Sequence, residues 1–96
     1  MAEPAIISFG VSAQTLRGFE EAMIQLKSDP RLPVIASKKI EKTDPLWRQW
    51  QARSNLIVFV RPDGYVGWAA LAPTANETLD GVRRALGMFV AERRRG

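Results

Sequence analysis

The sequence contains no cysteine and no histidine. Without cysteine there is no disulfide and no thiol–disulfide exchange. Zinc sites of the usual ligand types and Ser–His or Cys–His nucleophilic pairs are excluded as well. Histidine is also the side chain that most often transfers protons near neutral pH. Only carboxylate, lysine or tyrosine chemistry remains open, and we expect this chain by itself to have no catalytic residues and not to be an enzyme.

Glycine-rich phosphate loops are missing too. The chain has neither the G-x-G-x-x-G pattern of dinucleotide sites nor the G-x-x-x-x-G-K-[ST] pattern of triphosphate sites. The sequence therefore predicts no cofactor and no metal in this chain.

Long hydrophobic runs are also lacking. No unbroken apolar run is longer than the five residues of Leu56–Val60, whereas a membrane-spanning helix needs about 18. The segment Met1-Ala2-Glu3-Pro4 has neither the basic start nor the apolar stretch of a secretory signal. We expect a cytoplasmic protein that does not enter a membrane.

The net charge of +4 comes mostly from one end of the chain. Residues 51–96 hold seven basic and four acidic side chains, and Arg93, Arg94 and Arg95 account for the excess. A basic tail over residues 92–96 complements the negative end of a helix dipole and aids solubility. Nucleic-acid binding is kept as an alternative, but no RNP, helix-turn-helix or zinc-finger signature supports it.

Ninety-six residues with 46% hydrophobic and 25% charged side chains are typical of one globular domain, here residues 1–96. The first half predicts a strand over residues 4–10 and a helix from the N-cap Ser12 to residues 28–30. The apolar stripe of this helix consists of Leu16, Phe19, Met23 and Leu26. A second strand is predicted over Leu32–Lys39.

A short helix is predicted after Thr43-Asp44-Pro45, with aspartate as cap and proline in the first turn. It carries Leu46, Trp47 and Trp50 and ends before Ser54-Asn55. Tryptophan is enriched at binding hot spots. Trp47 and Trp50 are therefore the candidate interface residues, for a homodimer or for docking on another protein.

The second half predicts a hairpin followed by a helix. Leu56–Val60 is wholly apolar, which indicates a central strand. Arg61-Pro62-Asp63-Gly64 predicts a tight turn, and residues 65–71 are predicted to form the returning strand. Thr74-Ala75-Asn76-Glu77 is a capping box that begins the last helix. Its stripe consists of Leu79, Val82, Leu86, Phe89 and Val90, and Gly81 and Gly87 allow close packing on the sheet.

The predicted order is β-α-β-α-β-β-α. A right-handed β-α-β crossover and a closing hairpin give a four-stranded mixed sheet with helices on both faces. This α/β connectivity is thioredoxin-like. A ferredoxin-like order would need a further strand where the chain has Glu92 to Gly96.

The stretch from Leu56 to Trp68 resembles a signature near the end of phenol-hydroxylase-type, FAD-dependent aromatic monooxygenases. The matching residues after the apolar strand are Arg61, Pro62, Asp63, Gly64, Tyr65, Val66 and Trp68. The family has arginine after the tryptophan, where this chain has Ala69. Those enzymes end in a thioredoxin-like domain that packs on the catalytic body and often helps in dimer contacts.

The resemblance implies an accessory or dimerisation module, with FAD and NADPH bound only by a parent or partner protein. Two alternatives remain open at this point. One is a small-molecule-binding domain, or a carboxylate-based enzyme, with a pocket near Tyr65 and Trp68. The other is a basic nucleic-acid-binding domain.

Overall fold

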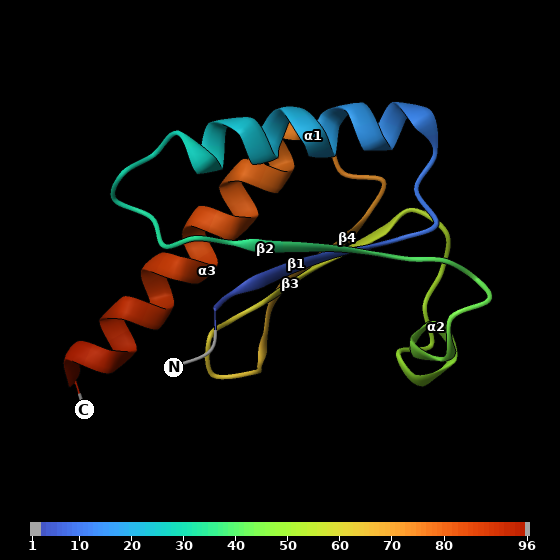
Figure 1. The fold of residues 1–96 in the computed structure, drawn as a ribbon. Coiled ribbons are helices and arrows are strands. Elements are labelled where there is room, and N and C mark those ends of the chain that lie inside the picture. Colours follow the sequence, from blue (N-terminus) through green and yellow to red (C-terminus); the bar gives the residue numbers. More distant parts are fainter. Residues whose placement is uncertain (1–2, 96) are drawn as a thin grey trace.

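The computed structural model describes residues 3–95, with side chains described as far as residue 87. Figure 1 shows the arrangement of the elements. They are β1 (Ala5–Phe9), α1 (Ala13–Lys27), β2 (Ala36–Ile40), α2 (Pro45–Gln49), β3 (Leu56–Val60), β4 (Val66–Leu71) and α3 (Ala75–Arg95). The sheet order is β2-β1-β3-β4, in which β1 and β2 are parallel and the other neighbours antiparallel. The predicted element order and mixed sheet are confirmed.

Side chains cap both ends of helix α1, where backbone N–H and C=O groups have no partner within the helix. The Thr15 backbone N–H donates to Oγ of the N-cap Ser12 at 3.3 Å. At the other end, Oγ of Ser28 donates to the Ile24 carbonyl at 2.8 Å. Phe19, Met23 and other residues of the predicted stripe point into the protein. The amphipathic pattern therefore identified the buried face of α1 correctly.

The main core lies between one face of the sheet and helices α1 and α3. Figure 1 shows α1 above the strands and the first turns of α3 behind it. Ile6, Ile57 and Phe59 supply the sheet's share of this core and are fully buried. Helix α1 approaches α3 closely at Gly18, where an added Cβ would lie 3.2 Å from the Ala75 backbone nitrogen. These two helices cover the first face of the sheet completely enough to exclude water from its centre.

Strand β2 begins later than the sequence predicted. Leu32 closes a turn, because its N–H donates to the Asp29 carbonyl at 3.2 Å, and the ladder starts only at Ala36, whose N–H donates to the Pro4 carbonyl at 2.9 Å. Pro33 has no N–H to give to a ladder. The predicted range of 32–39 is therefore wrong at both ends, since the strand runs on to the buried Ile40.

The second face of the sheet is covered at one end only. Figure 1 shows α2 beneath one end of the strands, on the side opposite α1. The expectation of helices on both faces is thus met fully on the first face and partly on the second. Strand β3 is central, as expected, with Ile57 and Phe59 facing the main core and Val58 facing the second side.

Helix α3 starts with the predicted capping box. The Thr74 N–H donates to Glu77 Oε1 at 3.0 Å, and the Glu77 N–H donates to Thr74 Oγ1 at 3.1 Å. The last turns of α3 extend past the sheet in Figure 1. The predicted stripe residues Phe89 and Val90 and the arginines of the basic tail lie outside the residues with described side chains. None of the helices in the described part of the chain combines the length and apolarity that a membrane crossing requires.

Candidate docking surface

The cross-strand register identifies the residues that share the second face of the sheet. The row beneath α2 consists of Ile40, Phe9, Leu56 and Leu71. The middle row consists of Lys38, Ile7, Val58 and Ala69. The last row consists of Ala36, Ala5, Val60 and Val66. Leu46, Trp47 and Ala52 pack against the buried residues of this face, so the cover supplied by α2 is centred on the first row.

Helix α2 is short and depends on its packing. Oδ1 of the N-cap Asp44 accepts from the Leu46 N–H at 2.9 Å, and Pro45 occupies the first turn, as the sequence predicted. The helix ends at the C-cap Trp50, and Gln51 follows with a φ of 50°. Because isolated helices shorter than about 12 residues are marginal in water, contacts with the sheet must hold α2 in place.

Those contacts are aromatic and centre on Phe9. The ring centroids of Phe9 and Trp47 lie 6.0 Å apart in an edge-to-face arrangement, and those of Phe9 and Trp50 lie 5.9 Å apart. Trp47 also covers Gly10, where an added Cβ would lie 2.8 Å from the Trp47 ring and the φ is +53°. Trp47 is half-buried, while Trp50 is 37% exposed. Of the two tryptophans, Trp50 therefore offers the more accessible contact surface.

Two further apolar side chains on the second face are exposed. Val66 is 54% and Leu71 53% exposed, and both belong to β4. The sequence reasoning missed them as contact residues, because it treated residues 65–71 only as a returning strand. The signal was the absence of any charged residue between Val66 and Leu71. We call the surface formed by Trp50, Val66 and Leu71 the open face, because α2 leaves these apolar side chains of the second side exposed.

The hairpin turn adopts the conformation that its sequence predicted. The Gly64 N–H donates to the Arg61 carbonyl at 2.9 Å, and the Arg61 N–H donates to the Tyr65 carbonyl at 2.8 Å. Gly64 has a φ of +89°, which glycine adopts without steric cost. The register then shifts between Phe59 and Val60, which leaves Gly67 as an extra residue in β4.

Side chains of the family-like motif also brace the turn. Arg61 Nε donates to Asp63 Oδ1 at 3.2 Å, and a second guanidinium nitrogen bonds the other carboxylate oxygen. The Arg61 guanidinium lies 5.9 Å from the centre of the Tyr65 ring. Trp68 lies on the first face and packs against the main core. In this arrangement Arg61 and Asp63 hold the shape of the loop.

We expect the Asp63 carboxyl to titrate below its ordinary range. Hydrogen bonds from Arg61, above all, and from the Tyr65 N–H lower the pKa of Asp63 in the folded chain. The carboxylate form thus favours folding above the unfolded-state pKa, and this contribution is lost as pH falls through the lower folded pKa. NMR titration of the Asp63 side chain should show the depressed pKa, and Arg61→Gln should move it upward. An unchanged pKa in that variant would contradict the bracing role.

Tyr65 does not line the hollow to which Trp68 contributes. Trp68 lines a hollow of about 230 Å³ together with Glu77, Asp80 and Arg84, whereas Tyr65 is 70% exposed and is not part of its lining. Small-molecule sites usually enclose about 300–1,000 Å³. At the position of the predicted small-molecule pocket, the structure therefore has a small groove lined by charged side chains.

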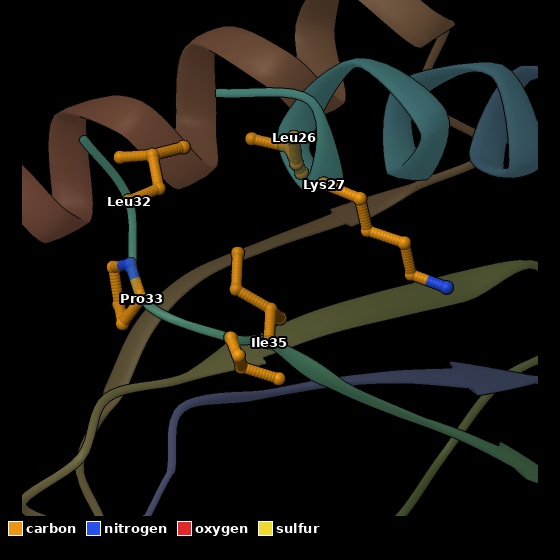
Figure 2. A pocket seen from close by; sticks show the side chains of 6 residues that line it. Leu26, Lys27, Leu32, Pro33 and Ile35 are labelled. Carbon is orange, nitrogen blue, oxygen red and sulfur yellow. The ribbon is translucent and has the colours of Figure 1, made fainter. Parts of the chain in front are cut away.

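Another hollow lies between the end of α1 and the loop before β2. Figure 2 shows Leu26, Lys27, Leu32, Pro33 and Ile35 around it, with the Lys27 ammonium turned away from the apolar side chains. Its volume is about 180 Å³. It is apolar and without a convergent set of polar groups, so it offers no chemistry.

The N-terminus of α1 carries two hydroxyl side chains that are hydrogen-bonded to each other. Ser12 and Thr15 have the C-x-x-C spacing, and their side-chain oxygens are 3.2 Å apart. Asn55 Oδ1 accepts from the Ser12 N–H at 2.6 Å, and the Asn55 N–H donates to the Phe9 carbonyl at 2.9 Å. The sequence reasoning treated Asn55 only as a helix breaker. Within the described residues no group of His, Cys, Asp or Glu could hold a metal ion.

Three arginines in the described part of the chain are held in ion pairs. Arg31, Arg61 and Arg84 each pair with a nearby aspartate. The three tail arginines, Arg93 to Arg95, fall among the residues without described side chains. The geometry therefore adds no observation in favour of the nucleic-acid alternative.

Comparisons with known proteins support the fold alone. No protein-family model matches the chain, and no curated protein matches it. Among solved structures, the chain is similar to the crystal structure of Trxlp from Edwardsiella tarda. The two share 12% identity with a TM-score of 0.62, over 81% of this chain and 79% of that one. The chain therefore has a thioredoxin-like α/β fold.

Proposed function

We propose that this chain is a non-catalytic docking domain, an accessory to a flavin-dependent aromatic hydroxylase that binds FAD and NADPH itself. The observation that carries the proposal is the open face. A sheet face that one five-residue helix covers at one end leaves Trp50, Val66 and Leu71 exposed on the same side. Leu71 lies in the row beneath α2 and Val66 in the last row, so the exposed apolar surface extends along β4. Apolar side chains exposed on a shared face typically mark a protein contact.

The charges around the open face favour a partner protein over a second copy of this chain. Lys38 belongs to the middle row of this face, and Arg48 and Arg53 lie on α2 and just after it. Two copies meeting through this face would bring basic rims together, and like charges at an interface cost affinity. The fitting partner has an apolar patch with an acidic rim.

The hairpin supports the choice of partner class. The residues that resemble the hydroxylase signature build a rigid loop next to β4, which carries two of the three open-face residues. In this proposal the domain contributes no reacting group, and the lack of cysteine and histidine supports that role. Its role is to bind and to hold the partner in an assembled state.

The proposal predicts that Trp50→Ala weakens docking. The probe is a phenol-hydroxylase-type flavoprotein that lacks its own C-terminal thioredoxin-like domain, titrated with this chain by calorimetry. Truncating a central tryptophan typically costs at least about 2 kcal/mol, so we expect affinity to fall more than tenfold. Ile24→Ala is the matched control, because Ile24 is 67% exposed on α1, on the other side of the sheet.

Circular dichroism must show both variants folded. Equal affinities of Trp50→Ala and the parent chain would reject the open face as the docking surface. Complete absence of binding by the parent chain would reject this partner class.

A further inference from the structure

The two edges of the sheet are protected differently. Strand β2, at one edge, carries Lys38 and Lys39, whereas β4, at the other edge, carries no charged residue from Val66 to Leu71. An edge strand exposes unpaired N–H and C=O groups, and charged side chains, especially lysine, are a common guard against pairing with another strand. The β2 edge is therefore protected by charge against pairing with another strand, and the β4 edge is unguarded in this sense.

The ladder shows which backbone groups of β4 point outward. The Ala72 N–H donates to the Asn55 carbonyl at 2.8 Å, so this pair is bonded. Bonded and non-bonded pairs alternate along an antiparallel ladder. Ala70 opposite Ile57 is then bonded to β3, whereas Ala69 and Leu71 direct their N–H and C=O groups to the free edge.

The edge is accessible, and its surroundings suit a second copy. Ala69 and Leu71 are exposed, and the bulge at Gly67 limits the regular part of β4 to residues 68–71. The hollow beside this edge is lined by Glu77, Asp80 and Arg84, so it holds charges of both signs. A two-fold axis sets two β4 strands antiparallel to each other, so each copy supplies the N–H and C=O groups that the other copy lacks at this edge.

We propose that β4 pairs antiparallel with β4 of a second copy, joining two four-stranded sheets into one continuous sheet. Because Val66–Leu71 is uncharged, the two paired strands place no like charges opposite each other. Both outer edges of the joined sheet are then β2 with its lysines, so assembly stops at the dimer. The inference uses the edge of β4 and does not depend on the proposed function.

The test is Ala69→Lys, followed by sedimentation equilibrium. Ala69 occupies the same cross-strand row as Lys38, so this variant gives β4 the guard that β2 already has. Because the paired segment is short, we expect the parent chain to dimerise with a Kd of roughly 10–100 μM. Ala69→Lys should raise this Kd at least tenfold. Ala69→Thr, which keeps the strand and adds no charge, should leave it within about threefold.

Ala69→Pro is the second variant, since it removes an outward N–H without breaking the bonded pairs with β3. It should also yield a monomer whose circular dichroism is native. Hydrogen exchange of the parent should show protection of the Ala69 and Leu71 amides that rises with protein concentration. A parent chain that is monomeric at about 300 μM, well above the expected Kd, would overturn the proposal. So would a dimer that Trp50→Ala dissociates and Ala69→Lys does not.

Discussion

Phe9→Ala is expected to lower the free energy of unfolding by about 3–5 kcal/mol, the usual cost of removing a buried phenylalanine. Phe9 is fully buried and is the residue that both Trp47 and Trp50 contact through their rings. Helix α2 has no buried residue of its own, so Phe9 of β1 is the fully buried side chain on which the aromatic packing of this helix depends. Since small domains are stable by about 5–15 kcal/mol in total, the loss is a large fraction of the whole.

Urea denaturation followed by circular dichroism measures this loss. Before unfolding begins, the tryptophan emission maximum of Phe9→Ala should lie to the red of that of the parent chain, because both indoles lose the ring against which they pack. Ile7→Ala is the control on the same strand and face, where the side chain is only half-buried, and it should cost less than half as much. If Phe9→Ala costs no more than Ile7→Ala, the aromatic cluster does not hold α2.

Gly81→Ala is expected to destabilise the chain by about 1–3 kcal/mol, as overpacking of a closely packed site does. An added Cβ at this position would lie 2.4 Å from atoms of the Trp68 indole. Trp68 packs against the main core and lies next to Gly81 of α3, so the ring must tilt or α3 must move outward. This clash outweighs the gain of roughly 1 kcal/mol that alanine brings to a helix interior.

Gly87→Ala in the same helix is the matched control. Among the residues with described side chains, and apart from the helix's own backbone, no atom lies within 4 Å of an added Cβ at Gly87. We therefore expect only the helix-propensity gain of about 0.5–1 kcal/mol. The two variants should therefore shift the thermal midpoint in opposite directions. A stabilising Gly81→Ala would show that Trp68 does not pack closely on α3. The sequence reasoning expected both glycines to permit close packing, and the structure bears this out for Gly81 only.

Local signals in the sequence determined much of this protein. The cap at Ser12, the Asp44-Pro45 helix start, the Arg61 to Gly64 turn and the Thr74–Glu77 capping box all form as predicted. Each depends on a side chain or a φ preference that acts within four residues, so the sequence is sufficient to identify it. The order of elements followed from these signals, and the mixed sheet followed from that order.

The tertiary structure alone decided which residues form the surface. Strand β2 starts at Ala36 because of its pairing with β1 across some thirty positions of sequence, a contact that no local pattern encodes. The same holds for the exposure of Val66 and Leu71, which depends on how little of the second face α2 covers. The unguarded edge at β4 likewise exists because the topology places this strand last in the sheet. Hydrophobicity marks a side chain as apolar, but only the packing of distant segments determines whether water or protein covers it.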